Sequence, residues 1–160
     1  MKYVQKRSYC FYALGLLLMI SFLFSKAQAG VGVLNGQLIP CPNSPNCVCS
    51  EDSEDSEDSA SSAYIPPFLF AGSVETAWAN LKQIVVSSGG TIHSDENFYL
   101  LASYTTKWLR FVDDVEFRMD AENKRIHVRS ASRVGHSDFG ANKKRVEMLR
   151  ELFTQTSNQL

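Results

Sequence analysis

Hydrophobic and polar residues follow a helical period in the first part of the globular region of the chain. Four apolar residues between positions 74 and 85 recur at spacings of four, three and four, which places them on one helix face: Val74, Trp78, Leu81 and Val85. Ser73 can cap this helix, with Glu75 favourably placed in its first turn. Gly89 and Gly90 end it.

Strand-like segments follow at about 90–95, 98–106, 111–119 and 124–133. Because the links between them are short, neighbouring strands should pair antiparallel as a meander. A second helix is predicted over about 139–154, with one face formed by Phe139, Asn142, Val146, Leu149 and Phe153. The order helix, four strands, helix predicts an α+β fold, with both helices packed on one face of the sheet.

The last two predicted strands form a hairpin with a turn around 120–123, which would place Phe117 opposite Ile126. In this register Asp113 lies opposite Ser130, Asp114 opposite Arg129 and Glu116 opposite His127. Oppositely charged cross-strand pairs stabilise a sheet by about 0.2–1 kcal/mol each. The outer face, which carries Asp114 and Glu116, is therefore interpreted as a solvated sheet surface.

The inner face of this hairpin carries apolar residues from Phe111 to Ile126, together with polar residues that should find partners. The predicted cluster consists of Asp113, Ser130, Ser132 and Asn142. A buried polar group without a partner costs about 1–3 kcal/mol. We expect a closed hydrogen-bond network that fixes how the helix docks, and the alternative is a small polar pocket at the edge of the core.

The N-terminal segment is typical of a secretory signal peptide. Three basic residues and no acid precede the apolar run 11–24, and an A-x-A site ends at Ala29. We expect cleavage of residues 1–29, so that the mature protein begins at Gly30 in the periplasm or outside the cell. The alternative is an uncleaved membrane anchor, which would be the only membrane contact.

Composition divides the rest of the chain into further segments. Residues 30–50 form a turn-rich arm that contains three of the five prolines and three of the four cysteines. Residues 51–63 form an acidic linker with a Glu-Asp-Ser repeat, which we expect to be disordered because it has almost nothing apolar to bury. The α+β domain then covers 64–155, and 156–160 is expected to be a disordered tail.

The charge distribution argues against nucleic-acid binding. The chain has a net charge of −1, and residues 60–160 carry 12 Lys and Arg against 11 Asp and Glu. A basic region nevertheless lies near the second helix, where Arg129 and Arg133 share a strand face and Lys143 falls in the first helical turn. Guanidinium groups beside a helix N-terminus suit an anion. Asp138, beside them, is the expected cap of that helix.

Two strings in the chain resemble the family filed as domain of unknown function 1499. They are CPNSPNCVCS at 41–50, and FVDDVEF followed by RIHVRSASRVGHSDFGANKKRVE. The opening pattern C-P-x-S-P-N-C-V-S-S matches at Cys41, Pro42, Ser44, Pro45, Asn46, Cys47 and Val48. The closing pattern R-S-A-S-R-x-G-x-x-D-x-G-x-N matches at Arg129, Ser130, Ala131, Ser132, Arg133, Gly135, Asp138, Gly140 and Asn142.

The resemblance covers about 40–153, with Cys49 in place of a serine and a lengthened acidic link. It implies a small exported or envelope-associated protein and carries no established activity. The residues themselves leave Cys41 with two possible partners, Cys47 and Cys49. The resemblance implies a Cys41–Cys47 disulfide, which leaves Cys49 exposed, as a site of dimerisation or as an idle thiol.

Two functions are compatible with these patterns. The first is a non-enzymatic envelope protein that binds an anionic small molecule or a protein partner through the end containing Arg129 and Arg133. The second is a small hydrolase using Ser130 or Ser132 with His136 and an aspartate, although the chain has no G-x-S-x-G elbow. We expect no cofactor and no metal, because neither the histidines nor the C-x5-C-x-C spacing matches a known ligand pattern.

Overall fold

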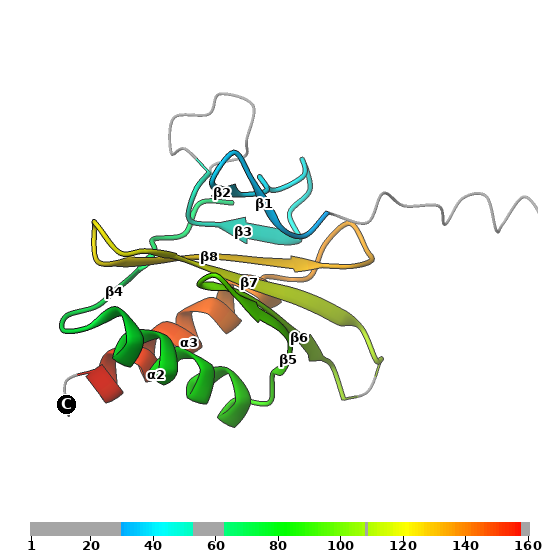
Figure 1. The fold of residues 1–160 in the computed structure, drawn as a ribbon. Helices are drawn as coiled ribbons and strands as arrows, with labels where there is room; N and C mark the ends of the chain where they lie inside the picture. The colour runs from blue at the N-terminus through cyan, green and yellow to red at the C-terminus, as the bar shows by residue number, and fades with distance from the viewer. Residues whose placement is uncertain (1–29, 53–62, 108, 158–160) are drawn as a thin grey trace, which may run out of the picture.

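The computed structural model describes residues 30–52, 63–107 and 109–157. The predicted signal peptide therefore lies outside the described residues, as does most of the acidic linker. The elements are β1 (Val33–Leu34), β2 (Gln37–Leu38), β3 (Cys47–Cys49), β4 (Phe68–Leu69), α2 (Val74–Ser87), β5 (Thr91–Glu96), β6 (Tyr99–Thr105), β7 (Val112–Asp120), β8 (Arg125–Ser132) and α3 (Ala141–Ser157). They form three layers, with a central sheet between the two helices and the N-terminal arm (Figure 1).

The central sheet is antiparallel and has six strands rather than the predicted four. Its order is β3-β8-β7-β6-β5, and β4 also pairs with β8. The α+β class and the antiparallel meander from β5 to β8 are confirmed. The sheet is wider than predicted because β3 and β4 hydrogen-bond to the edge of β8 that would otherwise be unpaired. Both added strands are too short to show an alternating pattern.

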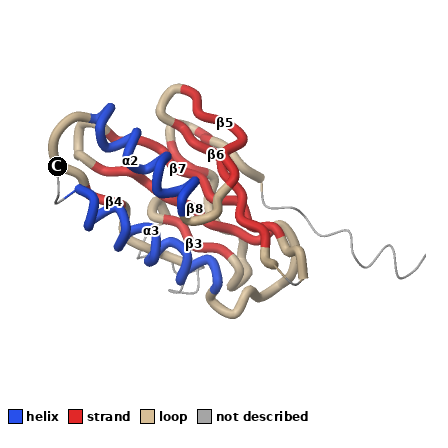
Figure 2. Tube along the Cα trace, turned by 90° about the horizontal axis from the view of Figure 1, so that it is seen from below, coloured by secondary structure: helices blue, strands red, loops and turns tan. Residues whose placement is uncertain are grey.

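Both helices cover the same face of the sheet (Figure 2). The Oγ atom of Ser73 accepts a hydrogen bond from the amide of Thr76, which confirms the predicted cap of α2. The rings of Phe68 and Phe153 lie 5.6 Å apart between the sheet and α3, where they form part of the core.

Helix α3 begins later and ends later than predicted. The carboxylate of Asp138 accepts hydrogen bonds from the amides of Gly140 and Asn142, so it caps the helix. Phe139 therefore lies in the turn before the helix, where its φ is 55° and its side chain is 92% exposed, instead of on the buried stripe. The C-terminal turn extends to Ser157, into the segment predicted to be disordered.

The β7–β8 hairpin has a register two residues away from the predicted one. Phe117 lies opposite Val128, and Glu116 opposite Arg129. The cause is the turn, because residues 121–124 form a four-residue loop that ends with Lys124 at a φ of 53°. A shift of two preserves the alternation of a strand, so each side chain stays on its predicted face while its partner changes.

The outer face of the sheet is covered instead of solvated. The amide of Gly32, just before β1, donates to Glu116 of β7, and the amide of Leu38 in β2 donates to Glu51. The arm and the first residues of the predicted linker thus form one layer over the charged face. Phe111, which was predicted to enter the core, precedes β7 and is exposed.

Candidate functional site

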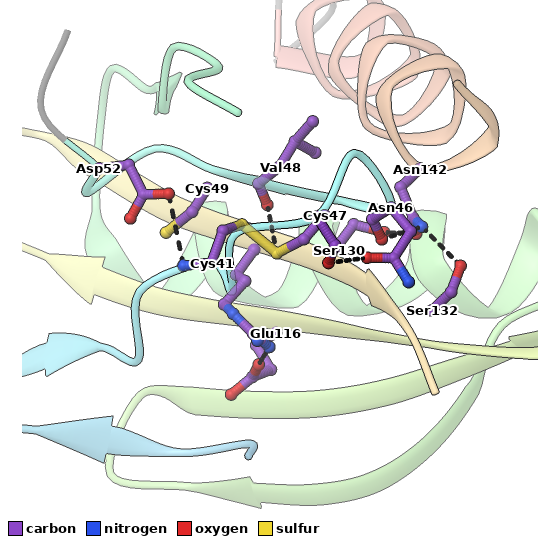
Figure 3. The surroundings of a disulfide bond; sticks show 12 residues. Cys41, Asn46, Cys47, Val48, Cys49, Asp52, Glu116, Ser130, Ser132 and Asn142 are labelled. Atoms are coloured by element: carbon purple, nitrogen blue, oxygen red, sulfur yellow. Dashed lines mark hydrogen bonds and ion pairs between the residues drawn. A yellow bond between two sulfur atoms is a disulfide. The ribbon is translucent and has the colours of Figure 1, made fainter. Parts of the chain in front are cut away.

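The disulfide joins Cys41 to Cys47, as the family resemblance implied, with a Cα–Cα distance of 5.7 Å (Figure 3). Its short loop brings Asn46 against the end of β8. The carbonyl oxygen of Asn46 accepts hydrogen bonds from the amide of Ser132 and from Nδ2 of Asn142, both at 3.0 Å. The opening segment, β8 and α3 therefore meet at a single residue.

Hydrogen bonds connect the four residues of the polar cluster, of which Figure 3 shows Ser130, Ser132 and Asn142. Ser130 donates to Oδ1 of Asn142 at 2.5 Å, while Nδ2 of Asn142 donates to Ser132 at 3.0 Å. Ser132 in turn donates to Asp113 at 2.6 Å. The cluster thus fixes the first turn of α3 on the sheet.

Sequence reasoning missed a fifth member of this cluster. Arg145 forms an ion pair with Asp113 at 2.6 Å and donates to Asn142 at 2.8 Å, while its guanidinium lies 5.0 Å from the centre of the Tyr104 ring. Arg145 follows Asn142 by three residues, which places both side chains on one helix face. This spacing is the sequence feature from which the contact could have been predicted.

On the outer face, Arg129 forms an ion pair with Glu116 at 2.6 Å, and both side chains are 0% exposed. Glu116 also accepts hydrogen bonds from the hydroxyl of Tyr99 and the amide of Gly32. Burial and the negative charge of Glu116 together raise the pKa of Tyr99. Arg129 is therefore enclosed between the sheet and the arm. Because an external ligand does not reach it, Arg129 is not available to the predicted anion site.

Arg133 differs from Arg129 in its accessibility. Its Nε and Nη2 atoms donate to Asp114 at 2.9 and 2.7 Å, and its side chain is 39% exposed. The hydrogen bonds from Arg133 to Asp114 raise the pKa of the guanidinium. Both predicted cross-strand ion pairs are thus replaced, Glu116–His127 by Glu116–Arg129 and Asp114–Arg129 by Asp114–Arg133.

The four predicted ligand-binding residues do not converge on one point. Arg129 lies on the outer face of β8 and Arg133 follows that strand, whereas Asp138 precedes α3 and Lys143 belongs to its first turn. Asp138 is occupied as a cap, and Lys143 is exposed.

The serines proposed for hydrolysis lie apart from His136. Ser130 is fully buried against Asn142, Ser132 donates to Asp113, and His136 lies in the exposed loop after β8. A different histidine and serine lie within hydrogen-bond distance of each other. Nε2 of His93 is 2.7 Å from Oγ of Ser103 on the neighbouring strand. This pair could not be found from sequence, since a β-bulge at His93 alters the register of β5 and β6.

Several loops meet at one end of the sheet, because the start of β3, the start of β7 and the end of β8 are adjacent there. We call the described residues 106–107, 109–111 and 133–144, at this end, the loop end. Its basic residues are Lys107, Arg110, Arg133, Lys143 and Lys144, and its exposed large apolar residues are Leu109, Phe111, Val134 and Phe139. Asp138 is the one acid within these two segments, and it caps α3.

A comparison with protein families matches residues 37–153 to the family described as Protein of unknown function (DUF1499). The chain belongs to this family. Comparisons with curated proteins and with solved structures found no match.

In this DUF1499 protein, the residues that carry the family resemblance serve mainly to join the molecule together. Asn46 links the opening segment to β8 and α3, Ser130 and Ser132 bind Asn142, and Asp138 caps α3. Arg129 is part of the sealed ion pair. The two segments therefore contact each other and hold the opening segment, β8 and α3 together.

Cys49 is buried, contrary to the expected exposed thiol. Cys47 and Cys49 are two positions apart in β3 and face the same side, while Val48 between them enters the core. Burial raises the pKa of Cys49 to about 12. A buried and protonated thiol does not fit the proposed role in disulfide-linked dimerisation.

The part of the chain that the structure describes contains no group of three or more His, Cys, Asp or Glu side chains that could hold a metal ion. None of its helices has the length and apolar character needed to cross a membrane.

Proposed function

We propose that this protein is an exported, non-enzymatic binding domain that takes an anionic ligand at the loop end. The observation that carries the proposal is the charge of that end, whose two segments carry five basic residues and one acid, Asp138, which caps α3. One of the five, Arg133, is already paired with Asp114 of β7. Among the described residues, the other four form no ion pair, and cations without acidic partners attract anions.

The internal contacts support a binding role over a catalytic one. Asp113, Ser130 and Ser132 lie in the sheet next to the loop end, and all three are engaged in hydrogen bonds with residues of α3. Lys143 and Lys144 are exposed, and Arg133 is partly exposed. The ligand would therefore meet these cations at the surface.

A titration with inorganic tripolyphosphate at low salt tests this proposal on the mature protein. Lys143→Glu combined with Lys144→Glu should weaken binding at least about tenfold, because hydrogen bonds to charged groups contribute about 1.5–3 kcal/mol. Lys124→Glu combined with Arg125→Glu, at the opposite end of the sheet, is the matched control and should bind as the wild type does. Equal weakening by both pairs, or no binding by the wild type, would contradict the proposal.

Export is supported by the N-terminal sequence pattern and by the disulfide, which is typical of oxidising compartments. N-terminal sequencing of protein recovered from the cell envelope should find Gly30 first. An intact Met1 on a membrane-bound form would show an anchor instead.

The contact between His93 and Ser103 favours one second candidate, a hydrolase. If Nε2 of His93 accepts the hydroxyl proton of Ser103, the pair has the arrangement of a base and a nucleophile. A fluorophosphonate probe should then label the wild type but not Ser103→Ala. Absence of labelling in the wild type would reject this candidate.

A further inference from the structure

The loop end exposes large apolar side chains beside its cations, and we infer that the anionic ligand is the surface of a lipid bilayer. This inference rests on the proposed function, because the same lysines and arginines take part. It adds the apolar residues, which a bilayer would contact and a small soluble anion would not.

The apolar residues come from both segments of the loop end. Leu109 is 71% exposed in a tight loop, which is closed by a hydrogen bond from the amide of Phe111 to Oγ1 of Thr106. The amide of Arg133 donates to the carbonyl of Val112, so Phe111 and Val134 flank a pair of neighbouring strand ends. These side chains therefore project beyond the end of the sheet instead of into the core.

Phe139 is held outward by its backbone. Its φ of 55° lies in the left-handed region, which bulky residues rarely adopt. The hydrogen bonds from Gly140 and Asn142 to Asp138 fix this turn, and the buried Asn142 joins it to the sheet. The exposed ring is thus presented by a rigid support.

Basic residues flank the apolar ones in the sequence. Lys107 and Arg110 lie on either side of Leu109, and Lys143 and Lys144 follow Phe139 by four and five residues. Apolar side chains that enter the interface and cations that meet lipid phosphates are the two components of peripheral binding to anionic membranes. Both components occur together at the loop end.

The opposite end of the sheet offers a comparison with the same kinds of residue. Leu69 is 70% exposed there and pairs with Arg125, next to Lys124. Two acids, Asp120 and Glu122, lie in the same turn region. Leu69 and Phe98 are exposed large apolar residues at that end, where the charges are mixed, so Leu69 provides a matched control.

Sedimentation with lipid vesicles tests the inference on the mature protein. Wild type should bind vesicles of equal parts phosphatidylglycerol and phosphatidylcholine, and should not bind phosphatidylcholine alone. Leu109→Ser combined with Phe139→Ser should weaken vesicle binding at least about tenfold, because two large apolar side chains would no longer be buried in the bilayer interface. Leu69→Ser should leave binding unchanged.

Tripolyphosphate separates this inference from the proposed function. The Leu109→Ser and Phe139→Ser variant should keep its affinity for tripolyphosphate, whereas Lys143→Glu with Lys144→Glu should lose both ligands. If the wild type bound tripolyphosphate but no vesicles, the inference of a bilayer ligand would be overturned. The ligand would then be a soluble anion or an acidic protein partner. Vesicle binding that is insensitive to the apolar substitutions would overturn it as well, and failure with both ligands would refute both proposals.

Discussion

At the scale of single residues, the ion pair between Arg129 and Glu116 is fully buried. Both side chains are removed from water, which is costly for each charge by itself. Glu116 offsets this cost with three contacts, to Arg129, Tyr99 and Gly32. The stability of this buried pair therefore depends on the arm, which covers the outer face and supplies the amide of Gly32.

Glu116→Ala should lower the free energy of unfolding by about 3–5 kcal/mol, because it leaves the charge of Arg129 buried without a carboxylate. Urea unfolding of the mature protein measures this change. Glu122→Ala, in the exposed β7–β8 turn, is the control and should stay within about 0.5 kcal/mol of wild type. A loss below about 1 kcal/mol for Glu116→Ala would mean that Arg129 finds another partner.

His127 should make stability depend on pH. Burial lowers its pKa, although the nearby carboxylates of Glu51 and Asp120 act in the opposite direction. The unfolded chain takes up a proton near pH 6.5 that the folded protein still excludes, so stability is full above about pH 6.5 and decreases below it. The slope contributed by this residue is at most about 1.4 kcal/mol per pH unit.

Urea unfolding at a series of pH values below about pH 6.5 measures this slope. His127→Gln should flatten the dependence, whereas His136→Gln, in the exposed loop after β8, should leave it unchanged. An identical slope in wild type and His127→Gln would show that His127 takes up its proton equally in both states.

At the scale of elements, the docking of α3 depends on Asn142. This side chain contacts Ser130 and Ser132 of β8, Asn46 of the opening segment and Arg145 of its own helix. One amide thus joins α3 to β8 and to Asn46, which lies 96 residues earlier in the sequence. The core residues of α3 contribute apolar burial, and Asn142 sets the position of its first turn.

Asn142→Ala should destabilise the protein by about 3 kcal/mol, because several buried donors and acceptors lose their partner at once. Thermal or urea unfolding measures the loss. Lys144→Ala on the exposed side of the same helix should cost less than about 0.5 kcal/mol. If the two variants were equally stable, the network would not hold the helix.

At the scale of the whole molecule, the arm belongs to the folded unit. β3 pairs with β8, Val48 lies in the hydrophobic core, and Gly32 donates to Glu116. Removal of the arm would expose an edge strand together with the Arg129–Glu116 pair.

We expect residues 64–155 alone to lose the native fold, although the sequence pattern marks them as the domain. Near-ultraviolet circular dichroism and urea unfolding should show no cooperative transition for 64–155, while 30–157 should unfold in one transition. A native-like transition for the shorter chain would show that the arm adds only local structure.

Local sequence determined those parts of this protein that depend on periodicity. The helix from 74 to 87 and the four strands of the meander follow from spacing and turn residues, because neighbouring residues alone decide them. The alternation of β7 and β8 also assigned Asp113 and Glu116 to their faces. A register error of two did not change those faces.

The tertiary structure decided which residues meet. Glu116 reaches Arg129, and not His127, because the turn has four residues instead of two. Cys49 is buried because β3 joins the sheet across more than 70 intervening residues. Periodicity carries no information about such long-range pairing, since each pairing depends on the free energy of the whole assembled sheet and not on any one segment.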